Sequence, residues 1–243
     1  MKILISKKTG IFYYYIKDDF HCKEGMILKE ELNSDKHLVL SNTKREFLVF
    51  DANNYDEKQK LKRGPQIILP KDLGYIASRT GITKNSFIIE AGGGSGAATI
   101  FFAQIAKKVH TYEIVEDHFK LIEKNLKIMQ IENVKVILGD LKEYIETEEK
   151  DVDMLFLDMP EPLIILEKNL SVLKSGSYIV CYIPSISQVQ TISNYLKTKE
   201  NELYLEEITE VILRHWKVND RVSRPEHRKE IDHTAFLVFI RKI

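Results

Sequence analysis

Cysteine is scarce in this 243-residue chain, which holds only Cys22 and Cys181. The two lie far apart, each in an apolar, strand-like setting, so we expect reduced packing thiols, no disulfide and no structural metal. No apolar run approaches the roughly 18 residues that a membrane-spanning helix needs. The opening MKILISKKTG also lacks the apolar core of a signal peptide. These absences predict a cytoplasmic protein without membrane association.

A net charge is missing as well. Lysine and arginine together number 36, as do aspartate and glutamate, so the formal net charge is +0. This balance gives no global signal for nucleic acid, although it leaves room for a local basic face. With 44% hydrophobic residues, the chain is long enough for one large core plus a smaller appended unit.

Residues 1–60 have the pattern of a small N-terminal β domain. Short strand-like runs (ILIS, GIFYYYI, MILKEEL, HLVLS and REFLVF) alternate there with turn-rich pieces. The polar segment DANNYDEKQKLKRGP follows and ends in Gly-Pro, as a linker does. We therefore expect a second, larger domain over residues 61–243.

In that larger domain, apolar runs alternate with helical stretches, which is typical of a parallel sheet covered on both faces. The apolar runs include FIIEAG, VHTYEI, VKVILGD, DMLFLDMP and SYIVCYIP. A helix is expected after the last of these, around residues 187–197. The segments EEITEVILRHWKV and HTAFLVFIRKI have no good helix between them, which indicates an antiparallel pair closing the sheet. We predict an α/β fold with a Rossmann-like, mostly parallel sheet and an antiparallel last strand.

A glycine-rich loop joins the strand FIIE to the next helix. It contains Gly92, Gly93, Gly94, Ser95 and Gly96. Glycines permit positive φ and let a ligand approach the backbone, so the loop indicates a nucleotide-type cofactor. Its G-x-G-x-G spacing differs from the dinucleotide fingerprint and from the P-loop. On the glycines alone, a tight strand-to-helix turn is the alternative.

Three acids follow at the ends of successive strands. Glu113 ends VHTYE, where a carboxylate can accept both hydroxyls of a ribose. Asp140 ends VKVILGD, where it can accept from the amine of adenine. Asp158 ends the fourth strand in LFLDMPEP, on a turn that two prolines stiffen. Each alone is typical of a solvated strand end or a helix cap, but Glu113 and Asp140 together with the glycine loop describe an adenosine-shaped site.

These motifs resemble the class I S-adenosylmethionine-dependent methyltransferases. From about residue 60 to the end, GPQIILPKD, LDMPEP, YIPS and SRPEH…DHTAFL add a resemblance to the tRNA adenine-N1 methyltransferases of the T-loop. That resemblance implies S-adenosylmethionine as cofactor and tRNA as substrate. It also implies methylation of N1 of adenosine 58, with adenosine 57 left open, and a homotetramer.

The resemblance also assigns residues. The implied cofactor-binding set is Gln66, Gly92, Gly93, Gly94, Ser95, Gly96, Glu113, His118, Asp140, Leu141 and Asp158. In the catalytic pair, Asp158 would accept from the N6 amine as N1 is alkylated, and Tyr182, ending CYIP, would stack on the extruded adenine. Core packing is an equal alternative for Tyr182, and an exposed helix position for His118.

Some positions depart from the family pattern. Leu69 stands where relatives often carry an aromatic residue or histidine, Leu163 stands where a tryptophan is common, and Gly93 stands where threonine is usual. The basic residues are interpreted as phosphate contacts, and His227 and His233 as structural. These basic residues are Lys62, Arg63, Lys71, Arg214, Lys217, Arg221, Arg224, Arg228 and Lys229.

Two other functions stay open at this point. One is a protein or small-molecule methyltransferase, since isoaspartyl methyltransferases also carry a G-x-G-S-G loop. The other is a catalytically silent tRNA-binding subunit. The acid-x-Pro-x-Pro turn suits an amino group conjugated to a ring nitrogen, and a silent subunit has no use for three aimed carboxylates, so both are disfavoured.

Overall fold

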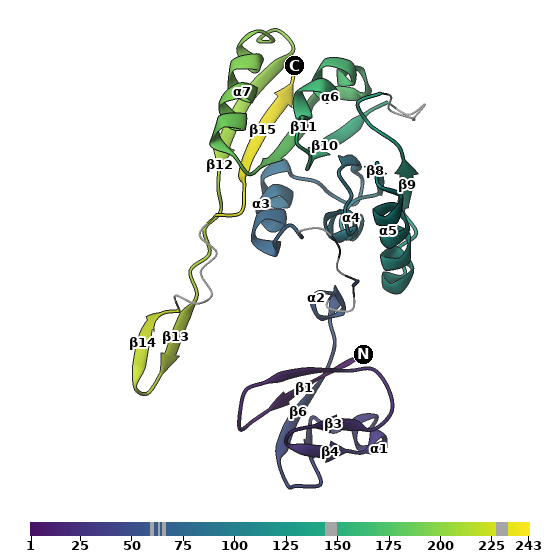
Figure 1. The fold of residues 1–243 in the computed structure, drawn as a ribbon, viewed down its shortest axis with the longest axis vertical. Coiled ribbons are helices and arrows are strands. Elements are labelled where there is room, and N and C mark those ends of the chain that lie inside the picture. The colour runs from purple at the N-terminus through teal and green to yellow at the C-terminus, as the bar shows by residue number, and fades with distance from the viewer. Residues whose placement is uncertain (59–60, 63, 65–66, 144–149, 227–232) are drawn as a thin grey trace. The chain divides into compact units, whose positions relative to one another are not determined.

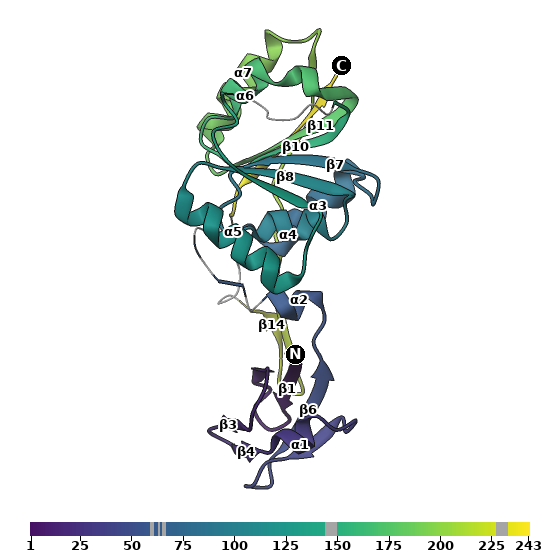
Figure 2. The same ribbon diagram turned by 90° about the vertical axis from the view of Figure 1, so that its right-hand side faces the viewer.

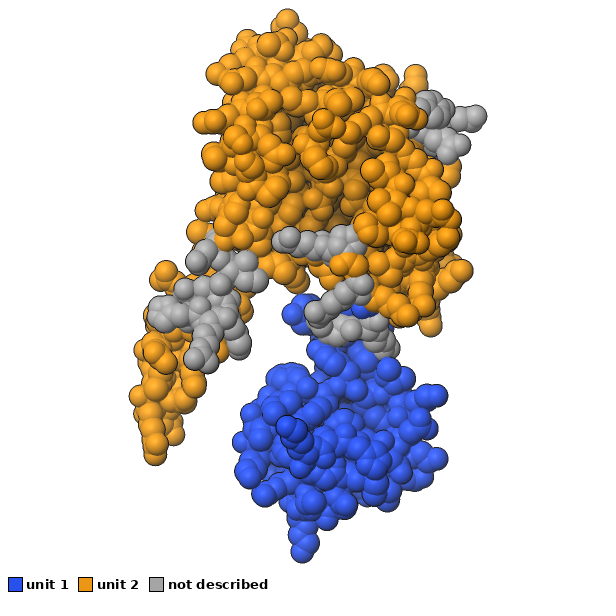
Figure 3. All heavy atoms as spheres, in the orientation of Figure 1, with its two compact units in different colours: residues 1–61 blue, residues 62–243 orange. Residues whose placement is uncertain are grey.

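The structure is a computed structural model of the chain, which describes residues 1–58, 61–62, 64, 67–143, 150–226 and 233–243. The chain divides into two compact units, residues 1–61 and 62–243 (Figure 3). In the parts that the structure describes, no helix is long and apolar enough to cross a membrane.

The first unit is a small β structure. Four strands form an antiparallel sheet in the order β2-β1-β6-β5, and β3 pairs with β4. Its core contains Leu4, Phe47 and Val49 from the sheet and Ile27 and Leu32 from outside it. Its elements are β1 (Lys2–Ser6), β2 (Phe12–Tyr15), β3 (Phe20–Cys22), β4 (Gly25–Ile27), α1 (Lys29–Leu32), β5 (Leu38–Leu40), β6 (Glu46–Asp51) and α2 (Asn54–Glu57).

Two short helices in this unit differ from the strand-and-linker pattern expected from sequence. MILKEEL is a strand only as far as Ile27 and then forms α1, because this places Leu32 in the core. The polar segment after β6 begins with α2. There the Asn53 side chain accepts from the N–H groups of Tyr55 and Asp56, a capping box that starts a helix in a polar sequence.

The second unit contains a seven-stranded sheet in the order β12-β15-β11-β10-β7-β8-β9. The five strands from β11 to β9 are parallel, and β15 runs antiparallel to both of its neighbours. The fold class expected from sequence is thus confirmed. The elements are α3 (Pro70–Thr80), β7 (Phe87–Ala91), α4 (Ala97–Ala103), β8 (Lys108–Glu113), α5 (Glu116–Met129), β9 (Val134–Leu138), β10 (Val152–Leu157), α6 (Pro162–Lys168), η2 (Leu170–Val172), β11 (Leu173–Ile183), α7 (Ile186–Lys197), β12 (Leu203–Thr209), β13 (Trp216–Asn219), β14 (Val222–Pro225) and β15 (Phe236–Lys242).

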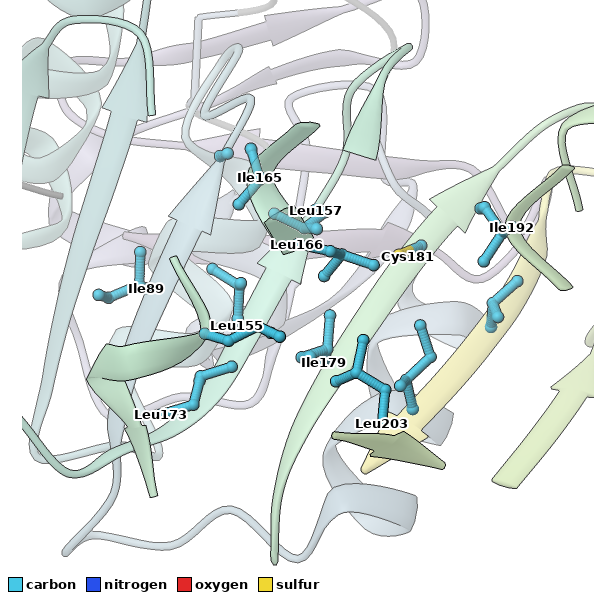
Figure 4. Close-up of a cluster of buried hydrophobic side chains, with 14 of the residues drawn as sticks. Ile89, Leu155, Leu157, Ile165, Leu166, Leu173, Ile179, Cys181, Ile192 and Leu203 are labelled. Carbon is cyan, nitrogen blue, oxygen red and sulfur yellow. The ribbon is translucent and has the colours of Figure 1, made fainter. Parts of the chain in front are cut away.

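Helices cover both faces of this sheet. Helices α6 and α7 lie on one face, and α3, α4 and α5 lie on the other (Figures 1 and 2). Side chains alternate between the faces along each strand. On β10, Leu155 and Leu157 point to the first face with Ile165 of α6 (Figure 4), and Met154 and Phe156 point to the second. This alternation buries both faces, as the continuous apolar runs in the sequence require.

The segment EEITEVILRHWKV is not one strand. Its first part belongs to β12, which pairs with β15, and its last part is β13, which forms a separate two-stranded hairpin with β14. Every residue of β13 is exposed. The turn forms because the Asn219 side chain accepts from the N–H groups of Arg221 and Val222. The sequence prediction was right about the pairing with the last strand and missed the hairpin.

Candidate cofactor site and active site

The glycine loop packs directly against the end of β10. Gly92, Gly94 and Gly96 have φ values of +89°, +56° and +80°, a region that favours glycine. A Cβ on Gly92 would lie 2.0 Å from the carbonyl oxygen of Asp158. On Gly93 it would lie 2.6 Å from Thr111 Oγ1. The backbone therefore reaches the sheet edge only because side chains are absent here.

Glu113 holds this loop in place. Its carboxylate accepts the N–H of Gly94 at 2.8 Å and the N–H of Val115 at 2.9 Å. The residue is only 5% exposed, yet it lines a cavity beside the loop. Each carboxylate oxygen keeps a further lone pair, so Glu113 can still accept from a ligand hydroxyl.

Two cavities meet at Gly92 and Glu113, which line both. The larger has a volume of about 340 Å³ and the smaller about 190 Å³. The larger one brings together most of the residues singled out from sequence: Gly92, Gly93, Gly94, Ser95, Glu113, His118, Asp158 and Tyr182. Asp140 and Leu141 line the smaller one. Gly96 lines neither and is the N-cap of α4, and Gln66 lies outside the described residues.

The smaller cavity has a polar rim and an apolar wall. Asp140 accepts the N–H of Lys142 at 2.9 Å, and Leu141 is 2% exposed within the core. Lys142 forms an ion pair of 2.6 Å with Glu161, and both side chains line the cavity. The arrangement suits a flat ring with an amine that can donate to Asp140.

A backbone hydrogen bond fixes the position of Asp158. Its N–H donates to the carbonyl of Ala91 at 3.0 Å, so the residue continues the β10–β7 ladder up to the cavity. Pro160 follows, and Pro162 occupies the first turn of α6, where proline is well tolerated. Burial raises the pKa of the Asp158 carboxyl to about 6. The group is therefore ionised at neutral pH and titrates just below it.

Tyr182 lies at the end of β11, half-buried in the wall of the larger cavity. Burial is the main cause that raises the pKa of its phenol to about 12, so the ring is neutral and keeps its proton. His118 also faces this cavity, with Nδ1 3.8 Å from the Glu113 carboxylate. Leu69, by contrast, precedes α3 and does not line the cavity, whereas Leu163 lines a separate groove with Pro160 and Gln188.

Glu90, whose role the sequence did not reveal, is the most perturbed carboxyl beside the site. It is fully buried on β7, and Oε2 accepts from Thr99 Oγ1 of α4 at 2.5 Å. Burial, followed by weaker repulsion from Asp158 and Glu113, raises its pKa to about 8. Glu90 is thus protonated at neutral pH and adds no negative charge beneath the loop. In the sequence, the signal for this residue was its place as the acid that begins the motif E-x-G-x-G-x-G.

Asn125 was also missed. This fully buried residue of α5 donates to the carbonyls of Ser95 and Lys62 at 2.8 and 3.1 Å, and it accepts the N–H of Lys62 at 3.0 Å. It therefore joins the glycine loop to the segment that enters the second unit. Its position in a helix, beside charged residues, gave no sign of this contact.

The expected phosphate contacts fall into three groups. The prediction of a phosphate contact is wrong for Lys71, whose side chain is only 6% exposed. Its Nζ donates to Asp72, Val211 and Thr234 at 2.8, 2.6 and 2.7 Å, which uses all three protons. Those that remain exposed are Lys62, Arg214, Lys217, Arg221 and Arg224. Arg63, Arg228 and Lys229, together with His227, lie outside the described residues. His233 contacts Glu210 and the Pro184 carbonyl at 2.8 and 3.1 Å.

The site fits S-adenosylmethionine by its own chemistry. Gly92 and Gly93 leave a cradle at the sheet edge that side chains would fill. The carboxylates of Glu113 and Asp140 are separate groups that can accept from hydroxyls and an amine, and acids suit a cationic ligand. Among the described residues, no cluster of three or more histidine, cysteine, aspartate or glutamate side chains could hold a metal ion.

A parallel sheet with one reversed strand, a glycine loop after its central strand and acids after the next two strands defines a class I S-adenosylmethionine-dependent methyltransferase. The family of tRNA methyltransferase complex GCD14 subunits has a sequence model that matches residues 58–236, and the chain belongs to this family.

Two relatives agree with this assignment, one of them along nearly the full length. The tRNA (adenine(58)-N(1))-methyltransferase TrmI of Thermus thermophilus is 34% identical, over 99% of this chain and 96% of its own. TrmI of Methanocaldococcus jannaschii, a tRNA (adenine(57)-N(1)/adenine(58)-N(1))-methyltransferase, is 31% identical over 80% of this chain and 78% of its own.

Solved structures give the same fold. The tRNA (m1A58) methyltransferase TrmI of Aquifex aeolicus matches with a TM-score of 0.81 and 29% identity, covering 100% of this chain and 96% of its own. A Thermotoga maritima protein described as a SAM-dependent O-methyltransferase matches with a TM-score of 0.84 and 29% identity, covering 100% and 92%.

Proposed function

We propose that this protein is an S-adenosylmethionine-dependent tRNA (adenine-N1)-methyltransferase acting on adenosine 58 of the T-loop, with adenosine 57 as a further target to test. The observation that carries the proposal is the Asp158 carboxylate, which faces the same cavity as the glycine loop and Tyr182. The Thermus thermophilus relative is named for adenine 58, and the Methanocaldococcus jannaschii relative for adenines 57 and 58.

When bound, S-adenosylmethionine supplies an electrophilic methyl group on a sulfonium. N1 of adenine already has a lone pair, so the protein removes no proton before attack and acts mainly by alignment and exclusion of water. As N1 becomes alkylated, positive charge develops on the ring and its N6 amine becomes a stronger donor. Asp158 accepts from that amine, an interaction that strengthens in the transition state. Tyr182 stacks on the extruded base.

We propose that the backbone of residues 92–96 lies against the cofactor and that Glu113 and His118 bind its ribose hydroxyls. Asp140 accepts from the adenine amine, and Leu141 lies beside the ring. The lining of the two cavities supports these roles, because Gly92 and Glu113 border both. Gln66 remains in the proposed set by family resemblance alone.

The hairpin is our proposed contact for tRNA phosphates. Lys217 and Arg224 are directly opposite each other in the β13–β14 register, and both are exposed. Like charges in such a pair repel each other, which costs stability unless an anion lies between them. A phosphate group supplies that anion and makes affinity depend on salt.

The finer organisation is also a proposal. We propose a domain of residues 1–60, a catalytic domain of residues 61–243, assembly as a homotetramer and a cytoplasmic location. Exposed apolar side chains support assembly: Phe12 and Tyr14 on β2, Leu40 on β5, and Trp216 and Val218 on β13. Free Cys22 and Cys181 suit a reducing compartment. Light scattering of the purified chain tests the tetramer, which a monomeric mass would exclude.

One experiment tests the activity. The full chain is incubated with unmodified tRNA and S-adenosylmethionine, and the nucleosides and T-loop fragments are analysed by mass spectrometry. We expect 1-methyladenosine at position 58. Methyl transfer to an isoaspartyl peptide or another oxygen nucleophile, with none to tRNA, would favour the O-methyl transfer named for the Thermotoga maritima structure. Absence of cofactor binding at millimolar concentration in calorimetry would indicate a silent subunit.

A further inference from the structure

His233 joins the ends of three neighbouring strands. It lies just before β15, which begins at Phe236 and runs between β11 and β12 in the sheet. Its Nδ1 is 2.8 Å from a carboxylate oxygen of Glu210, the residue that follows β12. Its Nε2 is 3.1 Å from the carbonyl oxygen of Pro184, the residue that follows β11. One ring therefore connects the two strands that flank its own, an arrangement here called the His233 bridge.

The two partners of the ring determine its charge. The Glu210 carboxylate and the Pro184 carbonyl can only accept hydrogen bonds. A neutral imidazole carries a single N–H, so its other nitrogen would point a lone pair at an oxygen atom. Only the imidazolium ion, which has an N–H at both positions, donates to both oxygens. These two hydrogen bonds, first that of Glu210 and then that of Pro184, raise the pKa of His233 above its ordinary value of 6.5.

The other groups that face the ring do not change this result. Lys71 of α3 repels the imidazolium, but this effect on the pKa is weaker than that of Glu210, and Lys71 is itself paired with Asp72. From β15, the uncharged ring of Phe236 lies with its centroid 4.8 Å from that of the imidazole. The His233 side chain is 40% exposed, so it can exchange its proton with solvent.

The His233 bridge closes the base of the segment that carries the β13–β14 hairpin. Glu210 and His233 stand at the two ends of this segment, residues 210–234, here called the arm. A second tie lies one residue further along at each end, where Lys71 Nζ donates to the Val211 carbonyl at 2.6 Å and to Thr234 Oγ1 at 2.7 Å. The base of the arm is thus closed by a buried lysine and by a partly exposed histidine. Of these two cations, it is the histidine that loses its proton near neutral pH.

The hairpin depends on this closure because it has no core of its own. All residues of β13 are exposed, and β14 contains no buried residue. Two strands without packing partners are only marginally ordered in water. Pro184 lines the larger cavity together with Asp158 and Tyr182. The His233 bridge therefore attaches the arm to the wall of the active-site cavity.

We propose that protonated His233 is a positioning residue for tRNA, which holds the base of the arm against the cavity wall so that phosphates bound at the hairpin place the T-loop at the active site. This inference rests on the proposed function, because it takes the hairpin as a tRNA contact. Deprotonation leaves one N–H, which stays with the charged Glu210 as the stronger acceptor and releases the Pro184 carbonyl. The bridge is complete below the ordinary pKa of histidine and is lost as pH rises through the raised pKa in the folded protein. Affinity for tRNA should therefore fall as the ring loses its proton.

The first test measures binding of unmodified tRNA to the full chain by fluorescence anisotropy, from about pH 6 to about pH 9. His233→Gln has a single NH2 group, which cannot donate in two opposite directions. It should weaken binding about three- to tenfold at the low end of this range, and the difference from wild type should vanish as pH rises. The single-turnover rate at saturating tRNA should stay within about twofold of wild type. The matched control, His21→Gln at an exposed position of β3, should bind tRNA as wild type does at every pH.

Glu210→Gln separates the bridge from a direct contact between His233 and phosphate. The glutamine amide can donate to Nδ1 of a neutral ring, whose Nε2–H still binds the Pro184 carbonyl. The bridge then survives deprotonation, so affinity in this variant should change by less than about twofold between the two ends of the pH range. A direct phosphate contact would keep the fall of affinity with pH in Glu210→Gln, and His233→Gln would then reduce the salt slope of binding by about 1. Either of these results would overturn the proposal.

A second measurement needs no tRNA. Nitrogen-15 nuclear magnetic resonance distinguishes an imidazolium from either neutral tautomer, and the His233 signals are those that His233→Gln lacks. The wild-type ring should remain mostly imidazolium at about pH 6.5, where an ordinary histidine is half neutral, and Glu210→Gln should release the proton at lower pH. A His233 ring that is already neutral at that pH rejects the bridge even if tRNA is methylated. An imidazolium in a protein that binds and methylates no tRNA rejects the proposed function, and with it the positioning of tRNA, but retains the bridge.

Discussion

Glu113 accepts the backbone N–H of Gly94 at 2.8 Å, so the acid that faces the cavity also shapes the loop beside it. The other oxygen accepts the N–H of Val115 at 2.9 Å. A single carboxylate therefore links the end of β8 to the loop after β7. In the proposed site, binding of a ribose would therefore use the same two oxygen atoms that hold the loop.

Glu113→Gln should weaken both functions. An amide has one oxygen, so its NH2 group must face either Gly94 N–H or Val115 N–H, and one of these donors is left without an acceptor. We expect about 10- to 100-fold weaker binding of S-adenosylmethionine and a loss of about 1–2 kcal/mol in the free energy of unfolding. Calorimetry and denaturant titration measure these values.

The control is Glu116→Gln, which changes an exposed acid three residues later whose carboxylate pairs with Lys120. It should alter neither quantity by more than about 0.5 kcal/mol. Wild-type cofactor affinity in Glu113→Gln would show that Glu113 is not a ligand of the ribose.

Gly93→Ala should damage the loop by crowding. The new Cβ would lie 2.6 Å from Thr111 Oγ1 and 2.7 Å from Ile122 Cδ1, both in packed surroundings. We expect a loss of about 1–3 kcal/mol in the free energy of unfolding, together with weaker cofactor binding. Gly74→Ala in α3 is the matched control, since no atom lies within 4 Å of its Cβ. It should stabilise the protein by about 0.5–1 kcal/mol, and equal destabilisation by both changes would contradict the geometry.

The parts of the site that the sequence predicted are those that strand ends determine. Parallel strands place their carboxyl ends at one edge, so Glu113 and Asp158 could be assigned to one site from their positions after apolar runs alone. The glycine loop could be predicted from the sequence for the same reason. In each case the residues that carry the signal are close together in the sequence.

The parts that it did not predict depend on contacts between distant segments. The positive charge of Lys71 looks the same in sequence whether it meets phosphate or a buried acid, and its partner Thr234 is 163 residues away. Asn125 holds the glycine loop from a helix whose sequence does not indicate this contact. The β13–β14 turn does carry a local signal, because Asn219 and Asp220 interrupt two β-rich runs, but the apolar pattern around it favours one long strand.

Asp158→Asn should slow methyl transfer far more than it weakens cofactor binding. The amide can still accept from an N6 amine, but it lacks the negative charge that stabilises the positive charge developing on the ring. A loss of about 10²- to 10³-fold in the single-turnover rate at saturating cofactor is expected, with cofactor affinity about tenfold weaker at most, because the carboxylate also attracts the sulfonium. A rate close to wild type would remove Asp158 from the mechanism.

The pH dependence of the wild-type rate should follow the same carboxylate. Burial raises the pKa of Asp158 to about 6, and only its ionised form stabilises the charged ring. The single-turnover rate should therefore be constant above about pH 7 and fall roughly tenfold per unit well below pH 6. Bound sulfonium lowers the apparent value, because a nearby cation favours the carboxylate. Asp158→Asn should lose this limb, and a wild-type rate that stays parallel to that of Asp158→Asn down to the lowest pH at which the protein is folded would contradict the assignment.

Glu90→Gln should change how stability depends on pH. The folded-state pKa of Glu90 is about 8, above its ordinary value of 4.5, so the folded chain holds a proton that the unfolded chain has released between these values. Stability from this group is full below about pH 4.5 and is lost as pH rises through about 8. The variant should show a smaller fall over this window, by on the order of 2–4 kcal/mol. Parallel stability curves for the two proteins would show that Glu90 is not protonated in the fold.

Lys217→Gln combined with Arg224→Gln should weaken binding of tRNA while sparing chemistry. The two cations face each other across the hairpin, so their removal relieves repulsion in the free protein and deletes two phosphate contacts in the complex. We expect an increase of about tenfold in the dissociation constant for tRNA and a decrease of about 1–2 in the slope of its logarithm against the logarithm of salt concentration. The rate at saturating tRNA should be unchanged. Lys199→Gln is the control, because Lys199 already pairs with Glu202 at 3.1 Å. A salt slope equal to that of wild type would exclude the hairpin as a phosphate-binding surface.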